Sequence, residues 1–243
     1  MIRIYPFIFI LLWSSAFITT KPIVDNSDPF AALAFRFFFV AVGFYLFSIY
    51  SHNSLIIKKK NLIESFLSGV LFHGFYLGGV FFSISIGMPA GIAALIVTLQ
   101  PILTNLLSSP ILNEKVSFKQ WIGAFLGFIG AALVLGLDLG SKIPLFGLIA
   151  TVISLIAITT STIWQKKLSN NLPLSVSNFY QAIGGCFFHS LIVIFFTEAF
   201  IDFTPTFLIA MGHQIFLVSF GAFTILMFLI KKNSASKTVS IFF

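Results

Sequence analysis

Long apolar runs alternate with short polar connectors along almost the whole chain. Eight of these runs approach twenty residues, the length of helix that crosses about 30 Å of hydrocarbon. Such runs predict helices, because backbone polar groups in lipid must be satisfied within the segment itself. The pattern therefore predicts an all-α fold, a polytopic membrane helix bundle with spans at residues 4–20, 30–50, 63–86, 90–110, 120–137, 145–165, 174–197 and 207–230.

The composition agrees with a membrane protein and excludes most other classes. With 58% hydrophobic and 9% charged residues and a mean hydropathy of +1.05, a soluble domain would have almost no polar surface. The net charge of +7 comes from basic residues that stand singly or in twos and threes between apolar runs, so we expect the lipid bilayer and not nucleic acid as the partner. The single Cys186 lies in an apolar run, which excludes an internal disulfide and a cysteine metal cluster.

Catalytic motifs are absent from the sequence. It contains no HExxH, no Gly-x-Ser-x-Gly, no Walker loop and no pair of aspartates within the apolar runs. We therefore expect no enzyme activity, no metal and no cofactor. Transport, in the absence of an ATP site, would draw on a substrate or ion gradient.

The distribution of Lys and Arg predicts the orientation, because cytoplasmic loops are enriched in these residues. With the N-terminus inside, eleven fall on the cytoplasmic side and two, Lys21 and Lys142, fall outside, while Arg36 lies within a span. We expect an integral protein of the plasma (inner) membrane with a cytoplasmic N-terminus. The inner set is Arg3, Lys58, Lys59, Lys60, Lys115, Lys119, Lys166, Lys167, Lys231, Lys232 and Lys237.

The stretch from Gly74 to Leu135 has the clearest organisation. A tight turn is predicted at residues 89–91, and an apolar run follows that ends in the polar connector NEKVSFK. The next run contains Gly123, Gly127 and Gly130, and small residues at this spacing predict a close approach between helices in lipid.

This stretch resembles the middle of an EamA-type repeat of the drug/metabolite transporter superfamily. The matching features are a small-residue turn, Ala-Ala-Leu, a proline within the helix, an acidic residue at the helix end, Gln-Trp-Ile-Gly and a glycine-rich helix. They lie at Ala93 to Leu95, Pro101, Glu114, Gln120 to Gly123 and Gly127 to Gly130, with earlier matches at Trp13, Ser14, Lys21, Pro29 and Arg36. The resemblance implies secondary transport around a central cavity formed by helices 1, 3 and 4 of one repeat and their counterparts in the other.

An internal repeat is predicted from a nearly constant offset. Lys21 and Lys166 are 145 residues apart, Pro29 and Pro173 are 144 apart, and the turns at 88–91 and 233–236 are 145 apart. Five spans per repeat require the second copy to be inverted. We expect a first repeat at 1–140 and an incomplete second repeat at 141–243, with three helices and the start of a fourth. This predicts a C-terminally truncated form of a ten-helix (5+5) architecture, lacking the last two helices.

Polar residues inside the spans are the candidates for substrate binding. Gln100, Pro101 and Thr104 fall mid-span, where they either line a cavity or make hydrogen bonds between helices; the family resemblance favours the cavity. His73 and Tyr76 share a face of the third span, and the alternative for His73 is a packed side chain bonded to a backbone carbonyl. Trp13 is mid-span, which leaves packing or substrate stacking.

Arg36 is the one cation well inside a span, about seven residues beyond Pro29. Its long side chain either reaches outward to the membrane surface or forms a fixed positive charge facing the bundle. In the second case its partner is a backbone carbonyl, an acid of an outer loop or an anionic group of the substrate. Glu64 and Glu114 flank helix ends and are expected to be solvated. His189 and His213 have no partner that the sequence identifies.

We expect secondary transport of a small organic metabolite, an amino acid or a derivative, with Trp13, His73, Tyr76, Gln100, Pro101 and Thr104 at the site. The first alternative is a non-transporting truncated remnant or half-partner of such a transporter. The partners left open are a second copy of the chain, in a homo-oligomer, and a complementing C-terminal fragment. A third possibility is a membrane-embedded enzyme that uses His73 or Glu64.

Overall fold

The fold was analysed in a computed structural model, which describes residues 4–113, 115–135, 143–168, 172–233 and 238. The described part is a bundle of helices, as predicted, and seven of them are long and apolar enough to cross a membrane. The shorter apolar helix α7 completes eight helical segments and corresponds to the predicted span at 120–137. The elements are α1 (Tyr5–Val24), α2 (Pro29–Tyr50), α3 (Lys59–Gly69), η2 (Val70–Tyr76), α4 (Leu77–Ser85), α5 (Ala90–Val97), α6 (Gln100–Leu112), α7 (Phe118–Leu135), α8 (Leu145–Leu168), α9 (Leu174–Phe196), α10 (Pro205–His213), η3 (Gln214–Ala222) and α11 (Phe223–Lys232).

Two of the membrane-length helices are composite. Residues Lys59–Ser85 form one continuous helix from α3, η2 and α4, here named span 3, and Pro205–Lys232 form another from α10, η3 and α11, here named span 8. The middle segments η2 and η3 are π-helical. π-Helical turns are rare and frequently occur at functional sites.

Proline and a capping side chain fix the start of two helices. Asp28 accepts hydrogen bonds from the backbone N–H groups of Phe30 and Ala31 (3.0 and 2.8 Å), and Pro29 occupies the first turn of α2. Thr204 caps α10 in the same way, directly before Pro205. Both starts follow from sequence, because proline is tolerated where the first N–H groups have no partner within the helix.

The span predicted at 90–110 is interrupted within the membrane-length segment. The helix α5 ends at Val97, a turn at residues 98–99 follows, and α6 begins again with Pro101 in its first turn. Proline lacks the N–H that would bond to the carbonyl four residues earlier, so the helix breaks in the turn before Pro101. The turn before this span was predicted at residues 89–91, but it lies earlier: Gly87 has φ of +97°, which favours glycine, and α5 already begins at Ala90.

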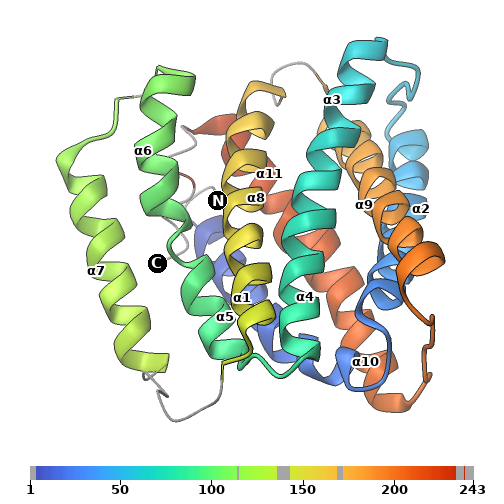
Figure 1. The fold of residues 1–243 in the computed structure, drawn as a ribbon. Coiled ribbons are helices and arrows are strands. Elements are labelled where there is room, and N and C mark those ends of the chain that lie inside the picture. The colour runs from blue at the N-terminus through green and yellow to red at the C-terminus, as the bar shows by residue number, and fades with distance from the viewer. Residues whose placement is uncertain (1–3, 114, 136–142, 169–171, 234–237, 239–243) are drawn as a thin grey trace.

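The order of the helices in space places segments far apart in sequence side by side. Contacts join α2 with α9, α8 with span 3, and α1 with span 8. In Figure 1 the pair α2 and α9 stands at one side of the bundle, α8 and span 3 lie near the middle, and α6 and α7 stand at the opposite side. The core therefore lies between α1, α2, span 3, α8 and span 8, as the buried apolar cluster shows.

Close approach through glycine occurs between span 3 and α9. A Cβ added at Gly69 would meet the backbone carbonyl of Gln181, and one added at Gly184 would meet the carbonyl of Phe66. The close approach predicted for the glycines of α7 is wrong for Gly123 and Gly130, where an added Cβ would meet no described atom within 4 Å. The helix α7 contacts α5 and α6 at the edge of the bundle, and these two glycines face away from both.

Candidate functional site

A small cavity lies inside the bundle, between α1, α2 and the π-helical parts of spans 3 and 8. Its lining is mostly apolar, with a few polar side chains, and its volume is about 30 Å³. That is room for about two water molecules. The residues that line this central cavity are Trp13, Ala16, Phe17, Thr20, Arg36, Phe72, His73, Tyr76, Leu77, Val80, Phe81, Gln214, Val218, Ser219 and Phe223.

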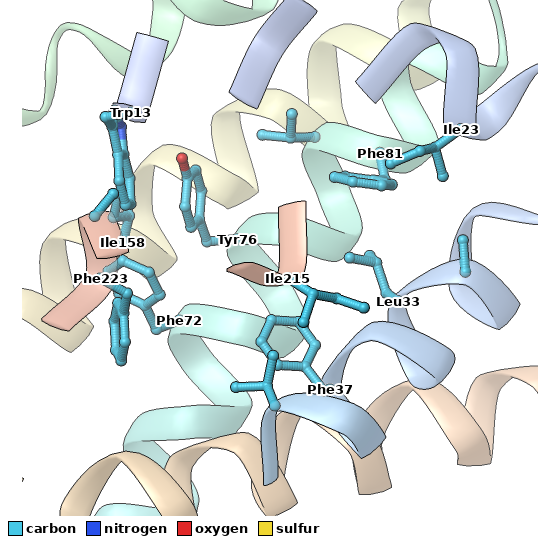
Figure 2. Close-up of a cluster of buried hydrophobic side chains, with 14 of the residues drawn as sticks. Trp13, Ile23, Leu33, Phe37, Phe72, Tyr76, Phe81, Ile158, Ile215 and Phe223 are labelled. Carbon is cyan, nitrogen blue, oxygen red and sulfur yellow. The ribbon is translucent and has the colours of Figure 1, made fainter. Parts of the chain in front are cut away.

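Aromatic rings form one wall of the central cavity. The rings of Trp13 and Tyr76 are nearly parallel, with an interplanar angle of 10° and 6.4 Å between centroids. The ring of Phe72 meets both of them edge-on, and the ring centroids of Phe223 and Phe72 are 5.0 Å apart. Figure 2 shows Trp13 beside Tyr76, with Phe72 and Phe223 next to them. This wall suits a flat or apolar group of a ligand.

Arg36 supplies a positive charge to the same cavity. Its side chain is 2% exposed, and its Nε donates a hydrogen bond to the Ser219 hydroxyl at 2.9 Å. Its Nη1 is buried and has no hydrogen-bond partner among the described residues, and no carboxylate in that part of the chain lies within ion-pair distance of it. The arginine therefore does not reach outward to the membrane surface: it is held inside the bundle by span 8, with part of its hydrogen-bonding capacity unused.

Gln214 joins span 8 to α1 at the cavity. Its Nε2 donates to the carbonyl of Ala16 (2.8 Å) and to the hydroxyls of Thr19 (2.9 Å) and Thr20 (3.5 Å). Its Oε1 is buried and has no partner among the described atoms. The cavity therefore offers unpaired acceptor capacity at Gln214 as well as unpaired donor capacity at Arg36.

Three histidines lie close to the cavity, and only one of them lines it. His73 packs its ring against Phe37 and Phe223, with centroids 4.4 and 4.6 Å apart, and its Nδ1 has no partner. The backbone carbonyl of His73 accepts a hydrogen bond from Nε2 of His189 at 2.8 Å. His213 contacts the Ser15 hydroxyl at 3.1 Å. The sequence left open whether His73 is a packed histidine whose ring bonds to a backbone carbonyl. In the structure the histidine with this role is His189.

The remaining predicted site residues lie elsewhere. Gln100, Pro101 and Thr104 are buried where α6 packs on α8, and they do not line the central cavity. Gln100 donates from Nε2 to the Thr162 hydroxyl at 3.0 Å, which is the hydrogen bonding between helices that the sequence left as the alternative. The structure thus brings together Trp13, Arg36, His73 and Tyr76, and separates them from the residues around Pro101.

A second group of buried polar side chains lies toward the ends of α3 and α8 that carry lysines. We name it the serine–glutamine cluster: Ser68, Ser161, Gln165 and Gln181. The two serine hydroxyls lie 3.2 Å apart, and Gln165 Nε2 donates to Ser161 (3.2 Å) and to Oε1 of Gln181 (2.8 Å). All four side chains are buried, and the cluster joins span 3, α8 and α9.

The sequence interpretation missed Gln214, Ser219 and Thr20 at the cavity. The repeat offset of about 145 residues carried a usable signal for Ser219 alone, because it relates the polar part of span 3 at His73 and Tyr76 to residues 218–221 of span 8. Among the described residues, no group of three or more His, Cys, Asp or Glu side chains is arranged to hold a metal ion.

Comparisons with known proteins give the family. The model of the EamA-like transporter family matches residues 3–136, more than half of the chain. The uncharacterized transporter YvbV of Bacillus subtilis is 24% identical over 227 residues, which cover 88% of this chain and 73% of that protein. A probable amino-acid metabolite efflux pump of Salmonella typhimurium is 25% identical over 166 residues, which cover 68% of this chain and 53% of the pump.

The fold also matches a solved structure. One crystal structure superposes with a TM-score of 0.79 at 18% identity, over 98% of this chain and 82% of that one. The predicted truncation and the predicted repeat boundaries are tested by none of these comparisons and stay predictions. The family match and the membrane-length helices both indicate a membrane protein. The chain therefore belongs to the EamA-like transporter family, a family of membrane transporters and not of enzymes.

Proposed function

We propose that this transporter moves a small organic metabolite, an amino acid or a derivative of one, across the inner membrane by binding it in the central cavity. The observation that carries the proposal is the cavity itself, where a buried cation and aromatic rings meet deep within four membrane-length helices. Ionisable side chains at such depth are rare in lipid and mark substrate pathways. The relative from Salmonella typhimurium, a probable amino-acid metabolite efflux pump, supports the substrate class.

The size of the cavity supports a closed stage of a transport cycle. Pockets that bind organic ligands have volumes of roughly 300 Å³ or more, whereas this cavity has about 30 Å³. Binding therefore requires the helices around it to separate. The π-helical segments η2 and η3 provide backbone that is not locked into regular α-helical bonding at the level of the cavity.

The internal repeat supports a rocking motion around this site. The segment η3 begins 144 residues after η2 begins and ends 146 residues after η2 ends, close to the offset predicted from the prolines. The contacts are paired in the same way, since α1 packs on span 8 as α8 packs on span 3. In inverted-repeat transporters the substrate site lies between the repeats.

Filling the cavity tests the function. Ala16→Phe adds a ring to the lining of a space that holds about two waters. We expect the full chain in proteoliposomes, given a panel of radiolabelled amino acids and their N-acetyl derivatives under a proton or sodium gradient, to transport at least one of them. The Ala16→Phe variant should reduce that transport to the level of empty liposomes.

The matched control is Leu11→Phe, which adds the same ring to the same helix at a position that is 71% exposed. It should transport at the wild-type rate. Normal transport by Ala16→Phe would show that the central cavity is not the site of this function. No transport of any panel member by the wild-type chain would overturn the proposed function itself.

A further inference from the structure

The chemistry of the central cavity points to one charge class of substrate. Resting on the proposed function, we infer that the site selects a monoanion, a carboxylate carried on an apolar or aromatic body, over a zwitterion or an amine. The carboxylate binds Arg36, and the apolar body lies against Trp13 and Tyr76.

The charge balance of the cavity is the first step of the argument. Arg36 is buried, arginine stays charged in proteins, and no described carboxylate lies within ion-pair distance of it. A buried charge is costly unless it is paired. A monoanion neutralises the cavity, whereas a zwitterion leaves the net positive charge in place and an amine doubles it.

The hydrogen-bonding groups are the second step. Arg36 uses Nε on Ser219, and Nη1 remains unpaired at the cavity. A guanidinium matches the planar geometry of a carboxylate, and charge-assisted bonds of this kind are among the strongest in proteins. The Ser219 hydroxyl accepts from Arg36 and so keeps its own proton free to donate to the same carboxylate.

An uncharged acceptor in the same cavity, Gln214, is the third step. Gln214 Oε1 is buried without a partner, so it can accept a hydrogen bond from a neutral N–H such as that of an amide. Because it carries no charge, it does not balance an ammonium group as a carboxylate would. The lining, with Phe72, Leu77, Val80 and Phe81 among its apolar part, contains no acidic side chain that would neutralise an ammonium group. An N-acylated amino acid or a simple aryl carboxylate therefore fits better than a free amino acid.

Four probes with the same phenyl body and different charges test the inference: N-acetylphenylalanine and 3-phenylpropionate are monoanions, phenylalanine is a zwitterion and phenethylamine is a cation. Their binding is measured by equilibrium dialysis against the full chain in nanodiscs. We expect the two monoanions to bind at least about tenfold more tightly than phenylalanine, and phenethylamine to show no saturable binding.

Variants connect the selectivity to Arg36. Arg36→Gln should weaken binding of the monoanions by about 10- to 150-fold, the range for losing a charge-assisted hydrogen bond, and should remove the preference over phenylalanine. Arg36→Lys keeps the charge and should keep the order of the probes, which excludes misfolding as the cause. Lys21→Gln, which removes a cation exposed near the end of α1, is the control and should change nothing.

The outcomes separate this inference from the proposed function. Tighter binding of phenylalanine or phenethylamine than of the monoanions, unchanged monoanion binding in Arg36→Gln, or no saturable binding of either monoanion would each overturn the inference. None of these results changes the Ala16→Phe comparison. Transport that the added ring blocks would then stand, with a substrate of another charge.

Discussion

Gln165→Leu is expected to open the half of the bundle that the serine–glutamine cluster holds closed. Gln165 on α8 donates to Ser161 on the same helix and to Gln181 on α9, at 3.2 and 2.8 Å. Leucine has a similar volume and no hydrogen-bonding group, so the change removes these bonds without a large cavity. If substrate passes to this side of the membrane, the contacts between α8, α9 and span 3 must separate during the cycle.

The size of the effect follows from the one bond that joins two helices, since the bond to Ser161 lies within α8. A hydrogen bond between membrane helices contributes on average about 0.6 kcal/mol, so the closed arrangement loses about 0.6 kcal/mol. This corresponds to about a threefold rise in the population of the open arrangement. Gln165 Oε1 is buried without a partner among the described residues, and its removal gives back part of that energy. Threefold is therefore an upper value.

A cysteine at Asn178 reports the opening. Asn178 is 1% exposed, and both its amide atoms lack a partner, so Asn178→Cys leaves the cluster intact. In a background without Cys186, the maleimide labelling rate of this cysteine measures the open population when opening and closing are fast. Gln165→Leu should raise the rate measurably and up to about threefold. Thr160→Leu, an exposed position on the same helix, should not change it.

Two results would refute this reasoning. A labelling rate that is the same with and without Gln165→Leu would mean that the cluster does not hold this half of the bundle closed. An equal increase with Thr160→Leu would mean that leucine on α8 loosens the bundle in general.

Two further predictions concern orientation and packing. Single cysteines are placed at the exposed positions Lys59 and Ala199 in a cysteine-free background. In intact cells an impermeant thiol reagent should label the cysteine at 199 and should not label the cysteine at 59. The reverse pattern would place the N-terminus outside. Gly184→Val should lower the stability of the detergent-solubilised chain by about 1–3 kcal/mol, because the new side chain meets a backbone carbonyl of span 3. Gly212→Val, where an added Cβ has open space, should show little loss in the same thermal denaturation; equal losses would contradict the packing argument.

Hydropathy predicted the helices of this bundle well, because lipid leaves the backbone of an apolar run almost no alternative to a helix. The π-helical segments were not predicted. Their wider turns depend on how spans 3 and 8 pack against α1 and α8, and no local residue pattern specifies that. The helix break at Pro101 was predictable, because proline lacks the N–H that continues a helix. The position of the preceding turn was not predictable from the sequence, because either Gly87 or Gly91 could have formed it.

The candidate site was predictable only in part, for a related reason. Burial depth along a span is readable from sequence, so Trp13, His73 and Tyr76 were chosen by depth and all line the cavity. Gln100 lies at a similar depth but on a helix that packs against α8 from outside the cavity. Which face of a helix meets which neighbour is a property of the tertiary packing. Depth alone therefore gave residues from two separate regions.

The two buried polar regions have a common origin if the repeat offset of 145 residues holds. Thr20 and Arg36 at the cavity then correspond to Gln165 and Gln181 of the serine–glutamine cluster. The correspondence fails at one point, since the first repeat has a cation where the second has a neutral amide. If the substrate binds Arg36 as we infer, this single charge is one anchor without a counterpart in the second half. The helices would then move around Arg36, and the substrate need not pass from one charged site to another.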